Sequence, residues 1–130
     1  MALSYSIDEA EQLVTITGEY SAADEWKDLL ARVLADPRRR AGFAFLRDLR
    51  QATHPVDAAT VIAIISVVRQ FWPRLRPRRA AILTRHDIDP AAMVAHALAD
   101  ADNLPLQAFN SYEAALEWLR GEDVPGEESP

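Results

Sequence analysis

Residues 43–72 read FAFLRDLRQATHPVDAATVIAIISVVRQFW, and this stretch contains one complete strand-turn-helix unit. It begins with a short apolar run from Phe43 to Leu49, which is typical of a strand buried on both faces. A polar turn follows, and apolar side chains then recur at helical spacing over residues 56–72. We expect this helix to stop before Pro73, because proline lacks the N–H that would continue the helix.

Further strand and helix patterns lie on both sides of this unit. The expected elements are strands over 3–8 and 12–18, a helix over 21–36, a strand over 43–49, a helix over 56–72, a strand over 79–85, a helix over 89–102, a strand over 105–109 and a helix over 111–121. This ββαβαβαβα order predicts a single α/β domain with a mostly parallel sheet of about five strands, an N-terminal antiparallel hairpin and four helices. The domain is expected to span residues 1–121, and residues 122–130 are expected to form an acidic disordered tail.

Three helix starts carry recognisable residues. Ser21 with Asp24 resembles a capping box, and Asp89 before Pro90 is typical of an N-cap followed by proline at the first helical position. At the start of the 56–72 helix two alternatives remain. Either Asp57 caps the helix, or the helix begins at Pro55 and Asp57 lies in its first turn.

Bulk composition limits the class of protein. The hydrophobic share of 49% suffices for a core, and the absence of cysteine excludes disulfides and thiolate metal sites. The N-terminus lacks the pattern of a signal peptide, and the longest apolar stretch, Val61 to Val68, is far too short to span a membrane. We therefore expect a cytoplasmic protein, and the Ala- and Arg-rich composition suggests a bacterial one.

The net charge of −6 is distributed in blocks along the chain. Residues 1–37 carry two basic and eight acidic side chains, residues 38–85 carry eleven arginines and two acids, and residues 86–130 carry one arginine and ten acids. Such blocks indicate either a partner surface or pairing between parts of the fold. The total charge argues against general affinity for nucleic acid.

In a parallel sheet, residues before the strands gather at one edge and residues after the strands gather at the other. The edge before the strands, here called the basic rim, is a candidate surface for an acidic protein or a lipid head group. It consists of Arg38, Arg39, Arg40, Arg76, Arg78 and Arg79. The opposite edge, here called the carboxyl rim, is where open α/β sheets usually bind ligands. Its candidate residues are Asp48, Arg50, His54, Asp57, Arg85, His86 and Ser111.

Catalytic and metal-binding patterns are sparse, so we expect no enzyme activity, no cofactor and no metal. His86, Asp87 and Asp89 are metal-ligand types close in sequence, but dedicated sites need convergent ligands. His96 lies beside the apolar stripe of its helix and is expected at the surface. The sequence has no glycine-rich phosphate loop and no nucleophile elbow.

Several stretches together resemble a known family. They are VTITGEYSAAD (14–24), FLRDLRQA (45–52), AAILT (80–84) and LQAFNSYEAALEWL (106–119). With the order of elements, they resemble the SpoIIAA-like branch of the STAS superfamily, named for sulfate transporters and anti-sigma-factor antagonists. The resemblance covers residues 3–121 and implies a non-enzymatic protein-interaction or regulatory module. The alternative is a binder of a small anionic or lipid-like ligand, at the carboxyl rim or beside the 56–72 helix.

The resemblance also implies a place for a phosphorylation switch, and this sequence departs from it there. Members that switch carry an Asp-Ser pair at the start of the second helix, and the matching pair here is Asp57-Ala58. Ala58 has no hydroxyl, and Thr53 and Thr60 are the nearest ones. We therefore expect Asp57 to act mainly at the helix start.

The 56–72 helix carries more apolar residues than one stripe needs. The expected inward stripe contains Val61, Ile64, Ile65, Val68, Phe71 and Trp72. A second set, here called the apolar strip, consists of Ala59, Ile62, Ala63 and Val67. An exposed strip of this kind is unusual in a monomer, so we expect a homodimer that buries it, with coverage by another part of the chain as the alternative.

Overall fold

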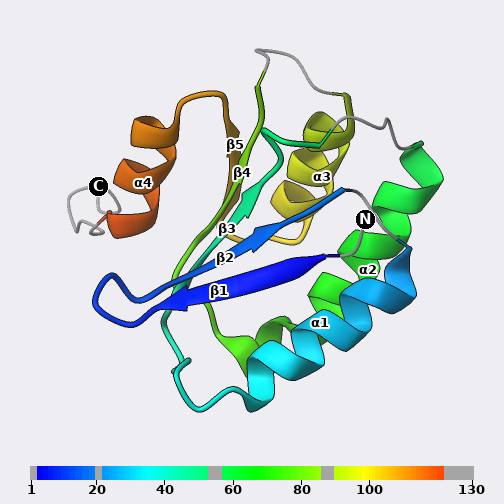
Figure 1. Cartoon of the computed structure of the whole chain (residues 1–130). Coiled ribbons are helices and arrows are strands. Elements are labelled where there is room, and N and C mark those ends of the chain that lie inside the picture. The colour runs from blue at the N-terminus through cyan, green and yellow to red at the C-terminus, as the bar shows by residue number, and fades with distance from the viewer. Residues whose placement is uncertain (1–2, 20–21, 53–56, 86–89, 122–130) are drawn as a thin grey trace.

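The computed structural model describes residues 3–19, 22–52, 57–85 and 90–121. All nine expected elements form in the expected order (Figure 1). They are β1 (Ser4–Asp8), β2 (Leu13–Thr17), α1 (Ala23–Ala35), β3 (Ala44–Asp48), α2 (Ala58–Leu75), β4 (Ala80–Leu83), α3 (Pro90–Ala101), β5 (Leu106–Phe109) and α4 (Tyr112–Arg120). The expected tail, residues 122–130, lies outside the described residues.

The strands form one five-stranded sheet in the order β1-β2-β3-β4-β5. β1 pairs with β2 in antiparallel fashion and the other pairs are parallel, so the predicted α/β fold class is confirmed. Each new strand adds to the same edge, and right-handed crossovers therefore place α1, α2 and α3 on one face. Figure 1 shows these three helices on one side of the sheet and α4 alone on the other.

The two faces bury two separate cores. Within β3, Phe45 belongs to the large core under α1, α2 and α3, whereas Leu46 belongs to the small core under α4. This alternation is the period-two pattern of a strand that is buried on both faces. The small core consists of Ala44, Leu46, Ala81, Leu83, Ala115 and Leu119.

The end of α2 differs from the prediction. The helix continues through Pro73 to Leu75 and closes at Arg76, which has a φ of 50° and donates its N–H to Trp72 O. A proline this near the end removes only one backbone hydrogen bond. Leu75 is 3% exposed, and its burial offsets that loss.

Helix starts on the two faces are capped by different groups. The Asp57 side chain accepts the Thr60 N–H at 2.9 Å, which confirms the alternative in which Asp57 is itself the N-cap of α2. The Ser111 hydroxyl accepts the Ala114 N–H at 3.2 Å and caps α4. The N-cap of α1 is Ala22, which makes no side-chain hydrogen bond, and Ser21 of the expected capping box lies outside the described residues.

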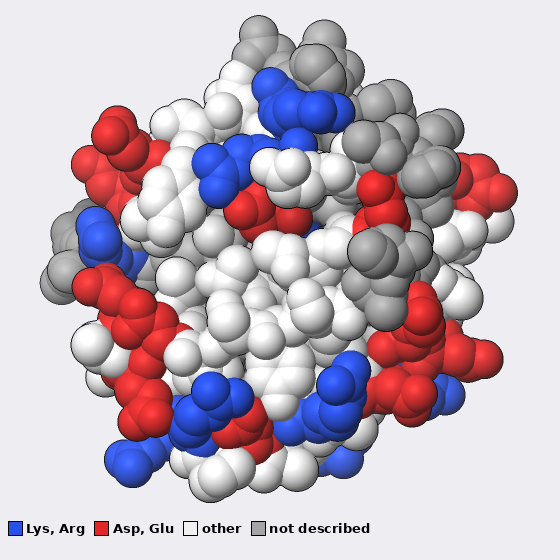
Figure 2. Space-filling model, in the orientation of Figure 1, with Lys and Arg blue, Asp and Glu red and all other residues white. Residues whose placement is uncertain are grey.

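The charge blocks of the sequence interleave in the fold. Arg69 pairs with Asp102, and Arg120 pairs with Glu11, so ion pairs join distant blocks. Figure 2 shows basic and acidic side chains side by side around the border of one face, while its centre, over β1 and β2, carries none. Ion pairs within the fold therefore account for part of the separation of basic and acidic residues along the sequence.

α2 is also the most apolar long helix in the described part of the chain. It has the length and composition of a membrane-crossing segment, with a mean hydropathy of 1.2 over 18 residues. Core helices of globular domains meet the same criteria, and here α2 lies on the sheet and packs against both α1 and α3. By itself the composition is weak evidence for a membrane span.

Candidate functional site

Asp48 and Arg50 of the carboxyl rim bind each other. Arg50 Nε donates to Asp48 Oδ1 at 3.0 Å and Arg50 Nη2 donates to Oδ2 at 2.8 Å. The guanidinium also stacks over the Tyr112 ring, with 5.1 Å between Cζ and the ring centroid. These hydrogen bonds from Arg50 hold the pKa of Asp48 below its usual value. The pair therefore ties β3 to the start of α4 instead of presenting free charges to a ligand.

The remaining described residues of this rim also have local roles. Asp57 and Ser111 cap helices, and Arg85 Nη2 donates to Ala52 O at 3.4 Å. His54 and His86 lie outside the described residues. The strand order contains no reversal, and ligand crevices of open α/β sheets form where the order reverses. The described residues of the carboxyl rim thus do not converge on one site.

Most of the basic rim is engaged within the fold. Arg39 Nη1 donates to Leu75 O at 2.8 Å, and Arg78 Nη2 donates to Leu119 O at 2.9 Å. Both acceptors lie in the last turns of helices, where carbonyls lack helical partners and the helix dipole is negative. Arg38 forms a bidentate pair with Asp36, with its shortest distance at 2.7 Å. Arg39 and Arg78 thus help to close helices, and the expected surface for an acidic partner stays a prediction.

Arg79 contacts the end of α4 in two ways. Its Nη1 donates to Trp118 O at 2.8 Å, and its Cζ lies 4.0 Å from the centroid of the Trp118 ring. Gly121 ends α4 beside it, and a Cβ at Gly121 would lie 2.5 Å from Arg79 Nη1. The glycine that the sequence suggested as a helix stop therefore also makes room for this arginine. Arg40 and Arg76 are also exposed, and neither side chain forms a hydrogen bond or an ion pair with another described residue.

The apolar strip is exposed in part. Ala59 and Ala63 lie at the surface, and Ile62 is 51% exposed. Val67 is only 5% exposed, so its assignment to the strip is wrong. Val67 lies three residues after Ile64 and four before Phe71, which places it on the inward face of the helix.

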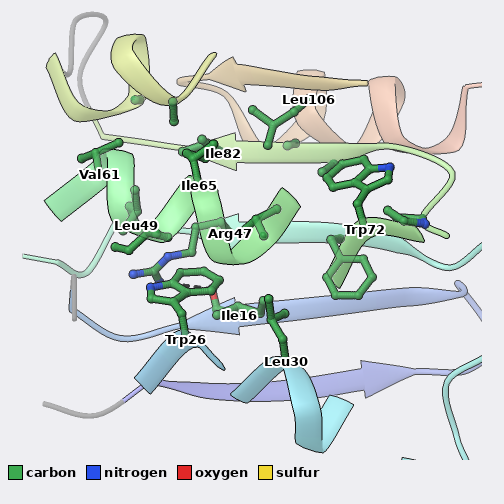
Figure 3. A pocket seen from close by; sticks show the side chains of 18 of the residues that line it. Ile16, Trp26, Leu30, Arg47, Leu49, Val61, Ile65, Trp72, Ile82 and Leu106 are labelled. Atoms are coloured by element: carbon green, nitrogen blue, oxygen red, sulfur yellow. Dashed lines mark hydrogen bonds between the residues drawn. The ribbon is translucent and has the colours of Figure 1, made fainter. Parts of the chain in front are cut away.

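A cavity lies beneath α2, between the helix and the sheet. Its volume is about 100 Å³. Figure 3 shows side chains from the sheet, such as Ile16 and Ile82, facing Ile65 of α2 across it, with Leu30 of α1 at one side. The walls are almost wholly apolar, although Arg47, Trp26 and Trp72 are among the lining residues. The least buried described lining residues are Val68, Trp72 and Pro77, near the end of α2.

Arg47 and Trp26 form one end of this cavity. Arg47 is 8% exposed and points to the same side of β3 as Phe45. Its Nη1 donates to Ile16 O at 3.4 Å, its Nη2 donates to Glu19 O at 3.1 Å, and its Cζ lies 5.3 Å from the Trp26 ring centroid. Burial of an arginine in an apolar core is costly, so its presence calls for a reason.

The sequence contained one signal for this site. Arg47 interrupts the apolar run FAFLRDL at a position two residues from both Phe45 and Leu49. In a strand, that spacing puts all three side chains on one face, and a charge in such a place indicates a buried polar group. The cavity itself leaves no local signal, because it arises from the volume left between α2 and the sheet.

Metal-ligating side chains do not gather in the described part of the chain, where no three His, Cys, Asp or Glu residues converge. His86, Asp87 and Asp89 lie outside the described residues. His96 is exposed on α3, in agreement with its expected surface position.

Comparison of the chain with protein-family models, with curated proteins and with solved structures found no match. The STAS-like resemblance therefore stays a prediction, and the function is inferred from the geometry of the cavity.

Proposed function

We propose that this protein is a non-enzymatic binding module that holds a small apolar molecule in the cavity beneath α2. The observation that supports the proposal is the cavity itself, which is lined by apolar side chains in the middle of the large core. Protein interiors normally leave few voids larger than a water molecule. An apolar cavity of about 150 Å³ stays dry and binds benzene, so one of about 100 Å³ suits a ligand no larger than a small ring or a short branched chain.

The chemistry of the lining favours binding over catalysis. Among the described residues that line the cavity, none is a nucleophile or a group that exchanges protons near neutral pH. Arg47 keeps its proton at all ordinary pH values, and Trp26 offers only its indole N–H. These side chains can hold and orient a ligand, but they supply no reacting group.

A titration with benzene tests the proposal. Chemical shifts of backbone amides would be followed by NMR, and the largest changes are expected at Ile16, Phe45, Ile65 and Ile82, which belong to the cavity wall. A ligand of this size in a small apolar site is expected to bind with a Kd of roughly 0.1–1 mM. Entry is expected near Val68 and Trp72, the less buried part of the wall.

The matched control is Ala95→Leu, which adds a larger side chain to the cavity wall. This variant is expected to fold and to lose benzene binding. Shifts that scatter over the surface, or equal binding by Ala95→Leu, would show that the cavity is not the site.

A second candidate function is the protein-interaction module that the family resemblance implies. The observation that favours it is the exposure of Ile62 on α2 and Met93 on α3, at 51% and 59%, on two helices that pack together. Exposed large apolar side chains on neighbouring helices are typical of a partner surface. Its test is the association state of Ile62→Glu, given in the Discussion.

A further inference from the structure

The sheet has a free edge at β1. This strand is the last in the strand order, so only one of its two sides is paired, through β2. Figure 2 shows the surface over β1 and β2 with no charged side chain at its centre and with charges of both signs around its border. An uncharged centre within a polar border is the usual anatomy of an interface between proteins.

The hydrogen bonds of the sheet show which backbone groups of β1 point toward β2. Ala44 of β3 lies opposite Leu13 and donates its N–H to the preceding residue, Gln12, at 2.9 Å. The backbone groups of Leu13 itself therefore point away from β3 and toward β1. Those of Thr15 do the same, because successive strand residues point to alternate sides. Thr15 lies opposite Ser6, so the backbone groups of Ser6 are paired with β2.

Tyr5 and Ile7, on either side of Ser6, consequently point their backbone N–H and C=O groups out of the sheet edge. Among the described residues, no backbone group outside the β1–β2 pair bonds to them. The side chain of Tyr5 is held on the α1 side, where its hydroxyl donates to Asp36 Oδ2 at 2.9 Å. β1 also contains no proline, lysine or bulge, the features that commonly block an edge strand. This edge can therefore pair with another strand.

The opposite edge of the sheet, at β5, is less suited to pairing. β5 has four residues and comes directly after Pro105, and the outward N–H of Leu106 donates to Leu104 O at 2.8 Å. Short strands and nearby proline are common ways of protecting an edge. Pairing of β1 with β5 of another copy would also build an open chain, whereas pairing of β1 with β1 closes about a two-fold axis.

We propose that two copies of this chain pair through β1 in antiparallel fashion, with the two-fold axis at Ser6, and form one continuous sheet. In this register Tyr5 lies opposite Ile7 of the second copy, and each such pair exchanges both of its backbone hydrogen bonds. An aromatic side chain then faces a β-branched one, which is a favourable cross-strand pair. Asp8 lies opposite Ser4 of the second copy, so like charges do not face each other along the strand.

Disulfide trapping tests this register, because the chain has no cysteine of its own. Ser6→Cys places one thiol of each copy across the two-fold axis, where Cα atoms of a non-hydrogen-bonded pair are about 4.5 Å apart. Ser4→Cys is the matched control. Ser4 is exposed on the same face of β1, but it would lie roughly 14 Å from its counterpart. Under mild oxidation at about 50 μM chain, Ser6→Cys is expected to form a covalent dimer at least tenfold faster than Ser4→Cys.

Charge reversal at the axis tests the reversible dimer. Ser6 is exposed, so Ser6→Lys and Ser6→Glu should both fold, and each would place two like charges directly opposite each other. Sedimentation is expected to show that each variant alone dimerises at least threefold more weakly than the unchanged chain. An equimolar mixture should recover dimerisation, because lysine then faces glutamate. Ile62→Glu, on the surface of α2, should leave this dimer unchanged.

The outcomes that contradict the proposal are distinct from those that bear on the cavity. Equal cross-linking of the two cysteine variants, or faster cross-linking of Ser4→Cys, would exclude the register at Ser6. A mixture of Ser6→Lys and Ser6→Glu that associates no better than either variant alone would exclude the axis. An unchanged chain that stays monomeric up to about 300 μM would exclude the pairing altogether, since an edge contact of this size is expected to have a Kd of roughly 10–100 μM.

Discussion

Each face of the sheet carries a tryptophan packed against an arginine, and the two pairs differ in how fully their hydrogen bonds are met. On the α4 side, Arg79 Cζ lies 4.0 Å from the Trp118 ring centroid, and Trp118 Nε1 donates to Ala80 O. On the side of α1, α2 and α3, Arg47 Cζ lies 5.3 Å from the Trp26 centroid, and Trp26 Nε1 has no acceptor among the described residues. The Trp118 N–H in the first pair thus has an acceptor, whereas the second pair borders the cavity.

The packing around each pair explains the difference. α4 is a single short helix over β3, β4 and β5, and small side chains such as Ala81 and Ala115 let it lie close to them. α1, α2 and α3 must cover the other face and also pack against one another. Side chains that must pack both on the sheet and against a neighbouring helix fill space less completely. A cavity therefore remains beneath α2. The cavity is a departure from close packing, and the Trp26 N–H beside it has no acceptor among the described residues. Departures of this kind are most often found at functional sites.

The largest difference is expected when a side chain is enlarged on each face. Ala115→Leu adds volume to the filled small core and should lower the free energy of unfolding by about 1–3 kcal/mol. Ala95→Leu adds the same volume beside the cavity and should cost clearly less, since the added carbons have space. Urea unfolding of both variants measures this. Equal losses in the free energy of unfolding would mean that the cavity cannot accommodate the added side-chain carbons.

Helix closure by arginine is shared by both faces and should not distinguish them. Arg39→Gln with Arg78→Gln removes one donor to α2 and one to α4, and the double variant should lose about 1–2 kcal/mol. Arg40→Gln with Arg76→Gln changes the net charge equally but removes no contact among the described residues, and it should stay within about 0.5 kcal/mol. Thermal and urea unfolding compare the two. If both double variants lose stability equally, the loss comes from removing two positive charges and not from losing the hydrogen bonds to the helix ends.

The two tryptophans provide a comparison of the indole N–H alone. Trp118→Phe and Trp26→Phe remove similar ring area, but only the first breaks a described hydrogen bond. Trp118→Phe is therefore expected to be less stable than Trp26→Phe by about 1 kcal/mol. Urea denaturation in the absence of any small molecule measures the difference. A Trp26→Phe variant that loses as much would show that Trp26 already has an acceptor.

The sequence predicted those helices and strands whose apolar residues recur at a regular spacing. Alternation marked the β1–β2 hairpin, a continuous apolar run marked β3, and helical spacing marked α2, since each pattern reports which faces are buried. The end of α2 could not be read in this way, because Pro73 is tolerated once Leu75 has a place in the core. Strand order also depends on contacts between distant residues.

The candidate site was harder to predict, because the fold decides which distant side chains and carbonyls form hydrogen bonds with each other. Arg79 and Trp118 are 39 residues apart in sequence, and only the fold shows that this arginine donates a hydrogen bond to the end of α4. The carboxyl rim was predicted from general rules for α/β sheets, and Asp48 and Arg50 turned out to bind each other. The cavity depends on unfilled volume, for which Arg47 within an apolar strand is the only local indication.

The two faces also differ in how their helix starts respond to acid. The Thr60 N–H donates to the Asp57 carboxylate and holds the pKa of Asp57 below its usual value, whereas Ser111 at the start of α4 does not titrate. Because the pKa is lower in the folded chain, the stabilisation is fully present above the unfolded pKa of about 4 and is lost as the pH falls through the folded value. Acid should therefore weaken the side-chain cap of α2 and leave the Ser111 cap of α4 unchanged.

Asp57→Asn tests this assignment, since asparagine can cap a helix but does not titrate in this range. The melting temperature of the variant is expected to depend less on pH than that of the unchanged chain between about pH 5 and pH 2. A modest loss of stability at neutral pH is also expected, because the negative charge at the start of α2 is removed. An unchanged acid profile would assign the acid sensitivity to other carboxylates, such as Asp48.

The smallest effect on stability is expected at the surface of α2, where the question is association. Ile62 is 51% exposed, so Ile62→Glu should stay folded and change the free energy of unfolding by no more than about 0.5 kcal/mol. If the exposed part of the apolar strip joins two copies, the unchanged chain will sediment as a dimer at micromolar concentration and Ile62→Glu as a monomer. Glu117→Gln on the outer side of α4 is the control and should leave the association state unchanged. A dimer that survives Ile62→Glu would place the interface elsewhere, and a monomer in both cases would exclude self-association through α2.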